Sequence, residues 1–526
     1  MHDSLTLSEK VFDVIVCGSG TSGSVVARRL SDDPDIHVLL LEAGAMQYSD
    51  ALRDAGRWPE ALGGPEDWAF PSEPDRGLNG RSLTMSMGKT VGGSSSINAM
   101  IWARGHQRDW DYFADEAGDS AWGYQAISDV YGMVEDYKGI SDMPRGKGGL
   151  VTVWQPRNPH PVAKALVESA ATLGIPSFVN PNGQMMTAKN GCAISDVRAN
   201  GQQRMTIFDS YLRPILTRKN LSIVTGAEVQ RLIMDGSRAV GVQVVVDGEQ
   251  RTFKASLQIV LSTGAINTPG ILMHSGIGRA EDLKRLGIPV VQDLPGVGEN
   301  LQDHICFPTI WEFDHPMPAQ GNGSEATLYI TSDANRVSPD ILMCQAEFPV
   351  CSPEIAQKGI PEHGWSLVAG LAQPKSRGRV RLRSANPGDP VAIHLNALSD
   401  PDDLDIARTA VELSRDIGAA YPLRDLNKRE CYPGRTYGAD LDLFLKESAV
   451  PFWHQTCTAK MGRDAMSVVD NNLKVYGIEN LTIADGSVLP RITSGNTMAP
   501  CVIIGERASH ILRQQFYDAP AVQFKG

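Results

Sequence analysis

The sequence lacks several features that would place it in common classes of protein. Its 526 residues contain no run of about 20 apolar residues, the length that a membrane-spanning helix needs. The N-terminus has no basic segment followed by an apolar core and a cleavage site, so we expect no secretory signal. Acidic residues outnumber basic ones by 61 to 49, and the net charge of −12 argues against nucleic-acid binding. We therefore expect a cytoplasmic protein without a transmembrane segment.

Cysteine is scarce and scattered. The eight cysteines form no CxxC pair, so the sequence offers neither a zinc-binding spacing nor a disulfide framework. Without an export signal, we expect reduced thiols that pack as small apolar side chains. A chain of this length, with 42% hydrophobic residues, can form two or more domains around a sizeable core.

A glycine-rich turn between an apolar strand and a helix is the first positive signal. Residues 11–17 (VFDVIVC) predict a buried strand, 18–23 (GSGTSG) form a GxGxxG turn, and TSGSVVARRLSDD predicts a helix. A second apolar strand follows at 37–44 and contains Glu42. This order is typical of a Rossmann-like parallel sheet, whose glycines and helix N-terminus bind a pyrophosphate. The spacing alone does not decide between NAD and FAD, and a tight turn without a ligand is the alternative.

The remaining sequence predicts a second, different sheet. Strands joined by turns are predicted at 221–235 and 238–248. Alternating residues between 310 and 440, as in GRVRLRSANPGDP, favour a mostly antiparallel sheet with one solvated face. Helices are predicted at 161–174 and 400–416. The fold class is therefore α/β, or α+β overall, with a Rossmann-like domain and a second domain built on an antiparallel sheet with flanking helices.

Further characteristic blocks run in order along the chain. They are GKTVGGSSSIN (88–98), GAINTPGILMHSGIG (264–278), LPGVGENLQDH (294–304), SRGRVRLRSANPGDPVAIHLNALSDPDDL (376–404), VPFWHQTCTAKMG (450–462) and IADGSVLPRITSGNTMAP (483–500). Together they resemble the glucose–methanol–choline (GMC) family of FAD-dependent oxidoreductases. The stretch GKTVGGSSSINAMIWARGHQRDWD is similar to bacterial choline-dehydrogenase-like alcohol oxidases and dehydrogenases.

The resemblance implies that an alcohol is oxidised to an aldehyde or ketone, with FAD as the hydride acceptor. Some relatives attach the flavin covalently through a histidine that follows the serine pair. That position is Ile97 here, so we expect non-covalent FAD. The electrons would pass to oxygen, which gives hydrogen peroxide, or to a quinone or other carrier. A non-redox, FAD-containing lyase of the same fold, similar to hydroxynitrile lyases, is the alternative.

The implied FAD site is spread over many of these blocks. It comprises Gly18, Ser19, Gly20, Thr21, Ser22, Gly23, Glu42, Ala43, Gly88, Gly92, Gly93, Ser94, Asn98, Ala99, Met100, Val229, Gly264, Trp453, Asp485, Gly486, Asn496, Thr497 and Met498. Val229 would contact adenine through its main chain. Glu42 would accept hydrogen bonds from ribose hydroxyls and repel a 2′-phosphate.

His454 and Asn496 are the implied catalytic pair. An imidazole, with an ordinary pKa of about 6.5, suits a proton acceptor near neutral pH, and a fixed amide can donate a hydrogen bond to the substrate oxygen. Two other interpretations of His454 are a buried core histidine and a zinc ligand together with Cys457. Zinc would need further ligands that the sequence does not supply, so no metal site is expected. His304, in NLQDH, is expected to fix a loop beside the cofactor.

The resemblance also implies a discontinuous division of the chain. The FAD-binding domain would comprise 1–150, 200–310 and 446–526, and the substrate-binding domain 151–199 and 311–445. The oligomeric state, monomer or dimer, stays open.

The identity of the alcohol also stays open, because fold does not fix the substrate. Choline-binding relatives hold a quaternary ammonium group with aromatic side chains and a carboxylate. Trp311, Phe313, Glu347, Phe348 and Trp365 are available for that purpose, but such residues are common in any chain.

Overall fold

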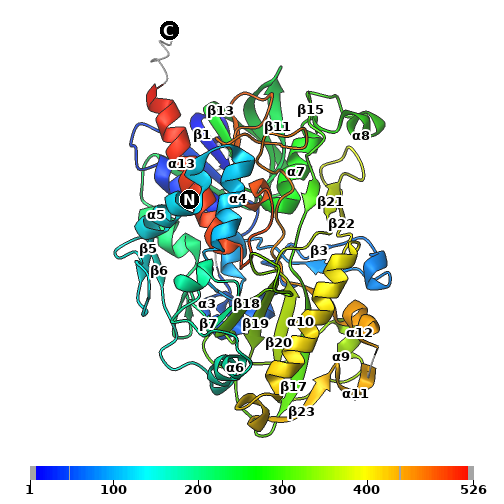
Figure 1. The fold of residues 1–526 in the computed structure, drawn as a ribbon. Coiled ribbons are helices and arrows are strands. Elements are labelled where there is room, and N and C mark those ends of the chain that lie inside the picture. The colour runs from blue at the N-terminus through cyan, green and yellow to red at the C-terminus, as the bar shows by residue number, and fades with distance from the viewer. Residues whose placement is uncertain (1–6, 47, 438–439, 519–526) are drawn as a thin grey trace.

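Two β-sheets organise the molecule, a computed structural model that describes residues 7–46, 48–437 and 440–518. In Figure 1 one sheet occupies the upper part of the ribbon and the other the lower part, with helices around both. Blue, green and red segments meet in the upper part, so pieces from distant parts of the sequence build it. This order agrees with an interleaved organisation, while the exact domain bounds stay a prediction.

The first sheet has the predicted Rossmann-like core. Within the described residues its strands are β1 (Val11–Cys17), β2 (Val38–Glu42), β10 (Leu221–Thr225), β11 (Ala227–Asp235), β12 (Arg238–Val246), β13 (Glu249–Leu261) and β25 (Leu481–Ile483). Their order is β10-β2-β1-β13-β12-β11, and β25 pairs with β13. The pairs β10–β2, β2–β1, β1–β13 and β13–β25 are parallel, whereas β12 pairs antiparallel with β11 and β13.

Helices cover this sheet and bring the two ends of the sequence together. Helix α2 (Thr21–Leu30) follows the GxGxxG turn and buries Val25 and Leu30. It packs against α13 (Met498–Asp518), the last helix of the described chain. A side chain at Gly505 of α13 would collide with Val25, so glycine permits this close approach. Helix α7, Gly264–His274, begins where β13 ends.

The second sheet is antiparallel throughout the described chain, which confirms the predicted type. Its strands are β7 (Gly191–Ile194), β17 (Ile305–Phe313), β18 (Ala326–Ile330), β19 (Ile341–Ala346), β20 (Gly364–Leu371), β23 (Asn427–Tyr432) and β24 (Val450–Pro451). The order is β23-β17-β20-β19-β18-β7, with β24 beside β17.

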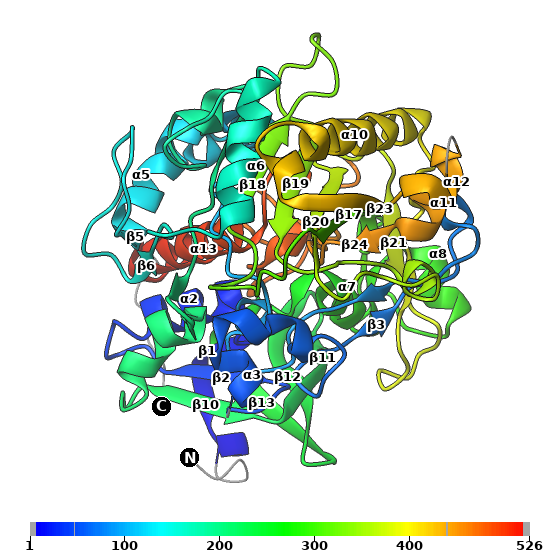
Figure 2. The same ribbon diagram turned by 90° about the horizontal axis from the view of Figure 1, so that it is seen from below.

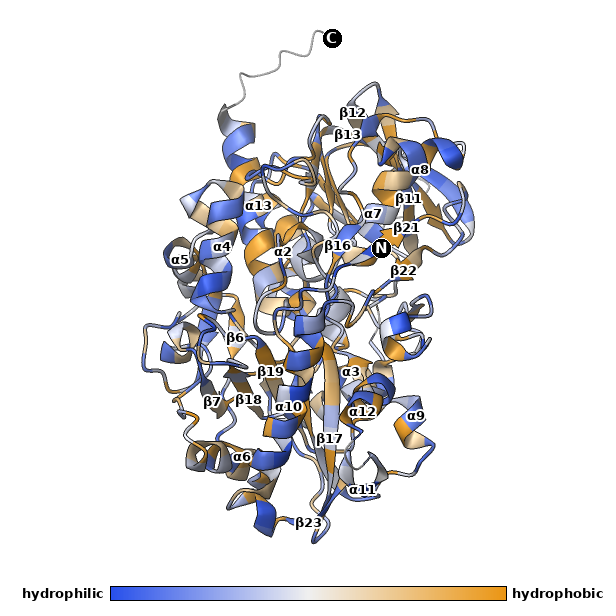
Figure 3. Ribbon diagram, turned by 45° about the vertical axis from the view of Figure 1, so that its right-hand side comes forward, coloured by the Kyte–Doolittle hydropathy of each residue, from blue (hydrophilic) through white to orange (hydrophobic). Residues whose placement is uncertain are grey.

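The prediction of one solvated face for this sheet is wrong. Every residue of β19 and β20 is buried, and Figure 3 colours β19 as largely hydrophobic. Helices α6 (Pro161–Thr172) and α10 (Pro401–Ala419) cover one face. Figure 2 shows both helices on the side away from β1 and β2, so the other face of the sheet turns toward the first sheet. A sheet covered on both faces needs apolar residues on both, as parallel sheets do.

The alternating stretch GRVRLRSANPGDP does not join this sheet. Its strand β21 (Gly378–Arg381) instead pairs with β16 (Glu299–Leu301) and β22 (Ala392–His394) in a small separate sheet. Alternation predicted a strand correctly here, but it carries no information about which strand is the partner.

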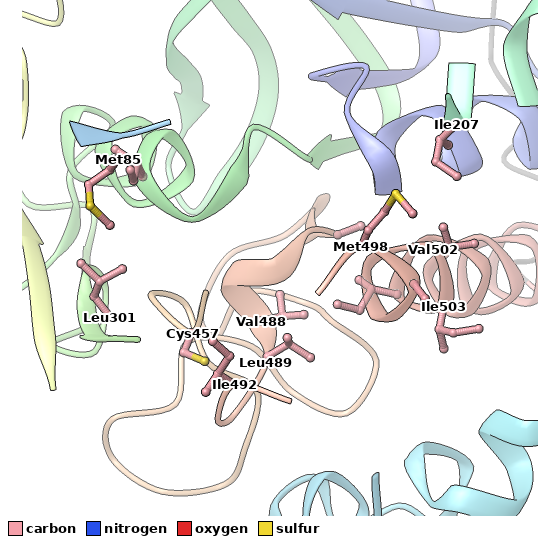
Figure 4. Packing of buried hydrophobic residues seen from close by; sticks show 14 of the residues in the cluster. Met85, Ile207, Leu301, Cys457, Val488, Leu489, Ile492, Met498, Val502 and Ile503 are labelled. Atoms are coloured by element: carbon pink, nitrogen blue, oxygen red, sulfur yellow. The ribbon is translucent and has the colours of Figure 1, made fainter. Parts of the chain in front are cut away.

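The segment 450–462, which contains His454, also contributes Cys457 to the apolar core. Figure 4 shows Cys457 close to Leu489 and Ile492, and Met498, Val502 and Ile503 along α13. Cys457 is fully buried in this apolar cluster, and burial raises the pKa of its thiol to about 12. Its role is therefore packing. In the part of the chain that the structure describes, no helix is both long and apolar enough to cross a bilayer.

Candidate active site

A cavity of about 520 Å³ is lined by residues of both sheets and collects most of the predicted site residues. Those on its wall are Gly18, Gly20, Thr21, Ser22, Glu42, Ala43, Gly88, Gly93, Ser94, Asn98, Ala99, Met100, Val229, Gly264, Trp453, His454, Asp485, Gly486, Asn496, Thr497 and Met498. This volume is typical of a site for a cofactor or small ligand. Segments more than 450 residues apart in sequence thus meet around one space.

Three predicted positions are not on the wall but shape the turns that form it. Ser19 donates both its main-chain N–H and its hydroxyl to Glu42, at 2.9 and 2.8 Å. A side chain at Gly23 would collide with the carbonyl oxygen of Gly18. Gly92 has φ of +83°, a conformation that favours glycine. Ser19, Gly23 and Gly92 therefore stabilise the turns that form the cavity wall without lining the cavity themselves.

The N-terminus of α2 offers a place for a phosphate. Gly20 is its N-cap, no side chain caps the helix, and Thr21 and Ser22 lie on the cavity wall. A Cβ at Gly20 would meet its nearest neighbour, the carbonyl oxygen of Ser262, only at 3.9 Å, so the space in front of this glycine is open. Free N–H groups and the positive end of the helix dipole together favour an anion here.

Glu42 ends β2 at the same wall. Its carboxylate accepts hydrogen bonds from Ser19 and from the main-chain N–H of Gly44 at 2.8 Å. Burial raises the pKa of Glu42, opposed by these hydrogen bonds. A carboxylate has about four lone-pair sites, so one remains for a ribose hydroxyl. The side chain thus fixes the glycine turn and can still face a nucleotide.

Other polar atoms on the wall have no partner in the protein. They include Nδ1 of His274 and Oδ1 of Asn496, both of which are buried without a hydrogen bond. Buried polar atoms rarely stay unpaired, so these two are available to a ligand. With the uncapped helix and Glu42, the wall fits a large dinucleotide such as FAD.

His454 and Asn496 are brought together at one end of the cavity, as predicted. Nε2 of His454 lies 3.2 Å from the amide nitrogen of Asn496. On the other side of the ring, Nδ1 of His454 lies 2.9 Å from Nδ1 of His304. The main-chain N–H of His454 donates to Asp303 at 2.7 Å. Both ring nitrogens are therefore in contact with a neighbouring side chain, and Asp303 fixes the main chain of His454.

The partners of His304 determine where the protons sit in this chain of contacts. Nε2 of His304 lies 3.0 Å from the carbonyl oxygens of Ala372 and Thr493, so it must carry a hydrogen and donate. Nδ1 of a neutral His304 is then an acceptor, and Nδ1 of His454 must be the donor. It follows that Nε2 of His454 carries a free lone pair and accepts from Asn496.

Both imidazoles are held in the neutral form. Burial lowers the pKa of His304 to about 4. Burial and the neighbouring His304 lower the pKa of His454 well below its ordinary value. A neutral imidazole with a lone pair on Nε2 is the form that a proton acceptor requires.

Several residues around His454 were not predicted from the sequence. His304 was expected only to fix a loop beside the cofactor, yet its ring contacts the ring of His454 directly. Trp58 and Phe452 line the cavity, whereas Trp311 and Trp365 do not. Those two tryptophans stack on each other at 4.4 Å within the core. The sequence gives no signal that separates the tryptophans of the core from the aromatic residues of the cavity. In the structure, Trp311 and Trp365 lie opposite each other on the paired strands β17 and β20.

Among the described residues, no three His, Cys, Asp or Glu side chains are placed to hold a metal ion. The earlier alternative of zinc binding by His454 and Cys457 has no support in the geometry either, because Cys457 is buried in the apolar core.

The fold and the cavity define a dinucleotide-binding protein with a histidine–asparagine pair at one end of its site. Family models described as GMC oxidoreductase match residues 12–306 and 374–505. The chain belongs to the GMC oxidoreductase family. It is accordingly an FAD-dependent oxidoreductase that acts on the CH–OH group of an alcohol.

Individual relatives are similar over nearly the whole chain. Mitochondrial choline dehydrogenase of Mus musculus is 34% identical, over 95% of this chain and 89% of that protein. Oxygen-dependent choline dehydrogenase of Brucella anthropi is also 34% identical, over 95% of both. The crystal structure of pyridoxine 4-oxidase from Mesorbium loti matches with a TM-score of 0.90 at 32% identity, over 97% of this chain and 100% of the other. A formate oxidase from Aspergillus oryzae, with a TM-score of 0.86 at 24% identity over 97% and 99%, shares the fold.

Proposed function

We propose that His454 is the proton acceptor in the oxidation of the alcohol and that Asn496 holds the substrate oxygen. The observation that carries this proposal is the free lone pair on Nε2 of His454, directed at the amide of Asn496 on the cavity wall. A hydroxyl oxygen beside both groups can replace this contact: it donates its hydrogen to Nε2 and accepts one from the amide nitrogen. The two nitrogens are 3.2 Å apart, so a single oxygen can lie within hydrogen-bond reach of both.

The protein's contribution is to remove the proton and stabilise the oxygen that loses it. Nε2 of His454 takes the hydroxyl hydrogen, while the Asn496 amide donates to the oxygen as negative charge develops there. FAD, when bound, supplies the acceptor for the hydride that leaves the carbinol carbon. His304 acts as a positioning residue, since its Nδ1 fixes which nitrogen of His454 carries the hydrogen.

We also propose that FAD is bound without a covalent link. Residue 97, which follows the serine pair, is isoleucine and lies on the cavity wall, where it has no atom that could bond to the flavin ring. The electrons then pass to oxygen or to a quinone-type carrier. The cytoplasmic location stays a prediction of the sequence.

Anaerobic mixing of the purified protein with a panel of alcohols tests this function. We expect a yellow protein whose flavin absorption bleaches with at least one alcohol. After acid precipitation, the FAD should appear in the supernatant; a yellow pellet would contradict non-covalent binding. An unchanged spectrum with every alcohol would favour the non-redox lyase instead. Parallel assays for hydrogen peroxide and for dye reduction then identify the electron acceptor.

A further inference from the structure

Apolar and aromatic side chains surround the part of the cavity that holds His454, which we call the alcohol end. The apolar residues of its wall include Trp58, Leu62, Ile101, Val350, Val368, Val450, Phe452 and Trp453. Phe452 packs edge-on against His454, with ring centroids 5.0 Å apart, and belongs to the apolar cluster that contains Val350 and Val368. Trp58 reaches the same region through an edge contact with Trp453 at 6.3 Å. The proton acceptor therefore stands at the edge of an apolar chamber.

The carboxylates on the cavity wall lie elsewhere. Among the described lining residues they are Glu42, Glu228, Asp389 and Asp485, and no lysine or arginine lines the cavity. Glu42 and Asp485 accept main-chain N–H groups of the glycine turns, Asp485 from Gly264 at 2.9 Å. Glu228 belongs to β11, and Asp389 is exposed and lies near His274 of α7. All four therefore lie at the end where the nucleotide is expected.

Two further carboxylates lie close to the alcohol end in sequence but are not part of its wall. Asp303 accepts the main-chain N–H of His454, and burial raises the pKa of Asp303 to about 7. Glu347 accepts the main-chain N–H of Gln320 at 2.7 Å, and burial raises its pKa to about 8. Neither side chain is placed to face the charge of a substrate in the cavity.

A charged alcohol would lose its hydration in this chamber without gaining an ionic partner. Aromatic faces attract a quaternary ammonium group, but such contacts replace only part of the water that a cation gives up. An anionic alcohol would find neither a lysine nor an arginine on the described wall. The apolar group of a neutral alcohol, in contrast, gains from contact with this surface.

We propose that the site takes neutral alcohols whose carbinol carbon carries an apolar or aromatic group, and that it selects against choline and other charged alcohols. This proposal rests on the proposed function, because it concerns the same cavity. It separates the chain from the two choline dehydrogenases to which it is 34% identical. It rests on the wall around His454, where the described lining residues offer no lysine, arginine or carboxylate to a charged alcohol.

A matched pair of substrates tests the proposal. Choline is compared with its neutral carbon isostere, in which a tert-butyl group replaces the trimethylammonium group, and benzyl alcohol is the aromatic reference. Anaerobic flavin reduction by the FAD-loaded enzyme gives the rate and the apparent affinity for each. We expect the isostere to exceed choline by at least about tenfold in kcat/KM. Equal or greater activity with choline would overturn the proposal and leave the proposed function intact. If no alcohol reduces the flavin, the proposed function itself fails.

Choline and its isostere also differ in intrinsic reactivity. A variant with a charge on the wall controls for this difference, because the same two alcohols are compared in both proteins. Val350 is half-buried, lines the cavity and makes only apolar side-chain contacts in its cluster, so Val350→Glu puts a carboxylate at the alcohol end. We expect Val350→Glu to shift the preference toward choline by about tenfold, and the neutral Val350→Gln to leave the ratio unchanged. Equal shifts in both variants would contradict an electrostatic origin. Leu62→Glu, at a second half-buried wall position, serves if Val350→Glu does not fold.

Discussion

The two ends of the cavity are built in different ways. The nucleotide end consists mainly of main chain and small side chains, such as Gly18, Gly20 and Ser22, which lie in short continuous blocks. The alcohol end consists of large side chains from segments far apart in sequence: Trp58, Val350 and Phe452. The nucleotide end binds mainly through main-chain groups, which are present in any sequence that forms the glycine turn. The alcohol end binds through side chains, which can vary. The difference shows how one family can keep its cofactor while it changes its alcohol.

Removal of the imidazole of His454 should have the largest effect, and it should affect the alcohol end alone. We expect His454→Ala to slow flavin reduction by about 10²- to 10⁴-fold, the usual contribution of a positioned acid or base. FAD content should stay unchanged, because the nucleotide end is untouched. Stopped-flow reduction and the flavin spectrum measure the two quantities separately. His363→Ala is the matched control, since His363 is exposed and is not part of the cavity wall. Wild-type reduction rates in His454→Ala would remove this residue from the mechanism.

His304 offers a finer test of the alcohol end. His304→Phe keeps much of the ring volume but removes the acceptor for Nδ1 of His454, so the hydrogen is no longer fixed on that nitrogen. We expect flavin reduction to slow by about 10- to 100-fold, with little change in the apparent affinity for the alcohol. His304→Gln can accept from His454 and still donate to the carbonyls of Ala372 and Thr493, so it should restore part of the rate. Equal losses in both variants, with equal losses of thermal stability, would indicate a purely structural role.

The substitution Gly20→Ala tests the nucleotide end, because it adds one methyl group to the glycine turn. Gly20 has φ of −62°, and a Cβ there meets no protein atom closer than 3.9 Å, so Gly20→Ala should fold normally. The methyl group would instead project where the backbone must approach a pyrophosphate. We expect FAD to bind at least about tenfold more weakly, or about 1.4 kcal/mol, in a fluorescence titration of the apoprotein. Gly132→Ala, at an exposed helical glycine with open space around it, is the control. Unchanged FAD affinity in Gly20→Ala would argue against a phosphate at this turn.

The same contrast explains what could be predicted from the sequence. The parallel sheet follows from buried apolar strands on either side of a GxGxxG turn, because both signals are local. His454 and Asn496 were found from short blocks, and their separation of 3.2 Å agrees with that pairing. The covered second face of the antiparallel sheet could not be predicted, since it depends on how two sheets pack. The contact of His304 with His454 likewise depends on a fold that joins residues 150 positions apart.

The pH dependence of flavin reduction gives the smallest and most specific effect at the alcohol end. Proton acceptance requires neutral His454, and burial beside His304 holds the pKa of His454 well below its ordinary value. A lowered pKa means that the free base persists to lower pH. We therefore expect the rate of flavin reduction to stay nearly constant from about pH 8 down to about pH 6, where an exposed histidine with a pKa of about 6.5 would be mostly protonated. Anaerobic stopped-flow measurements across this range, with a substrate that does not titrate, check the profile. A rate that already falls by half near pH 6.5 would mean that the proton acceptor has an ordinary pKa, and that the buried His304–His454 contact does not control it.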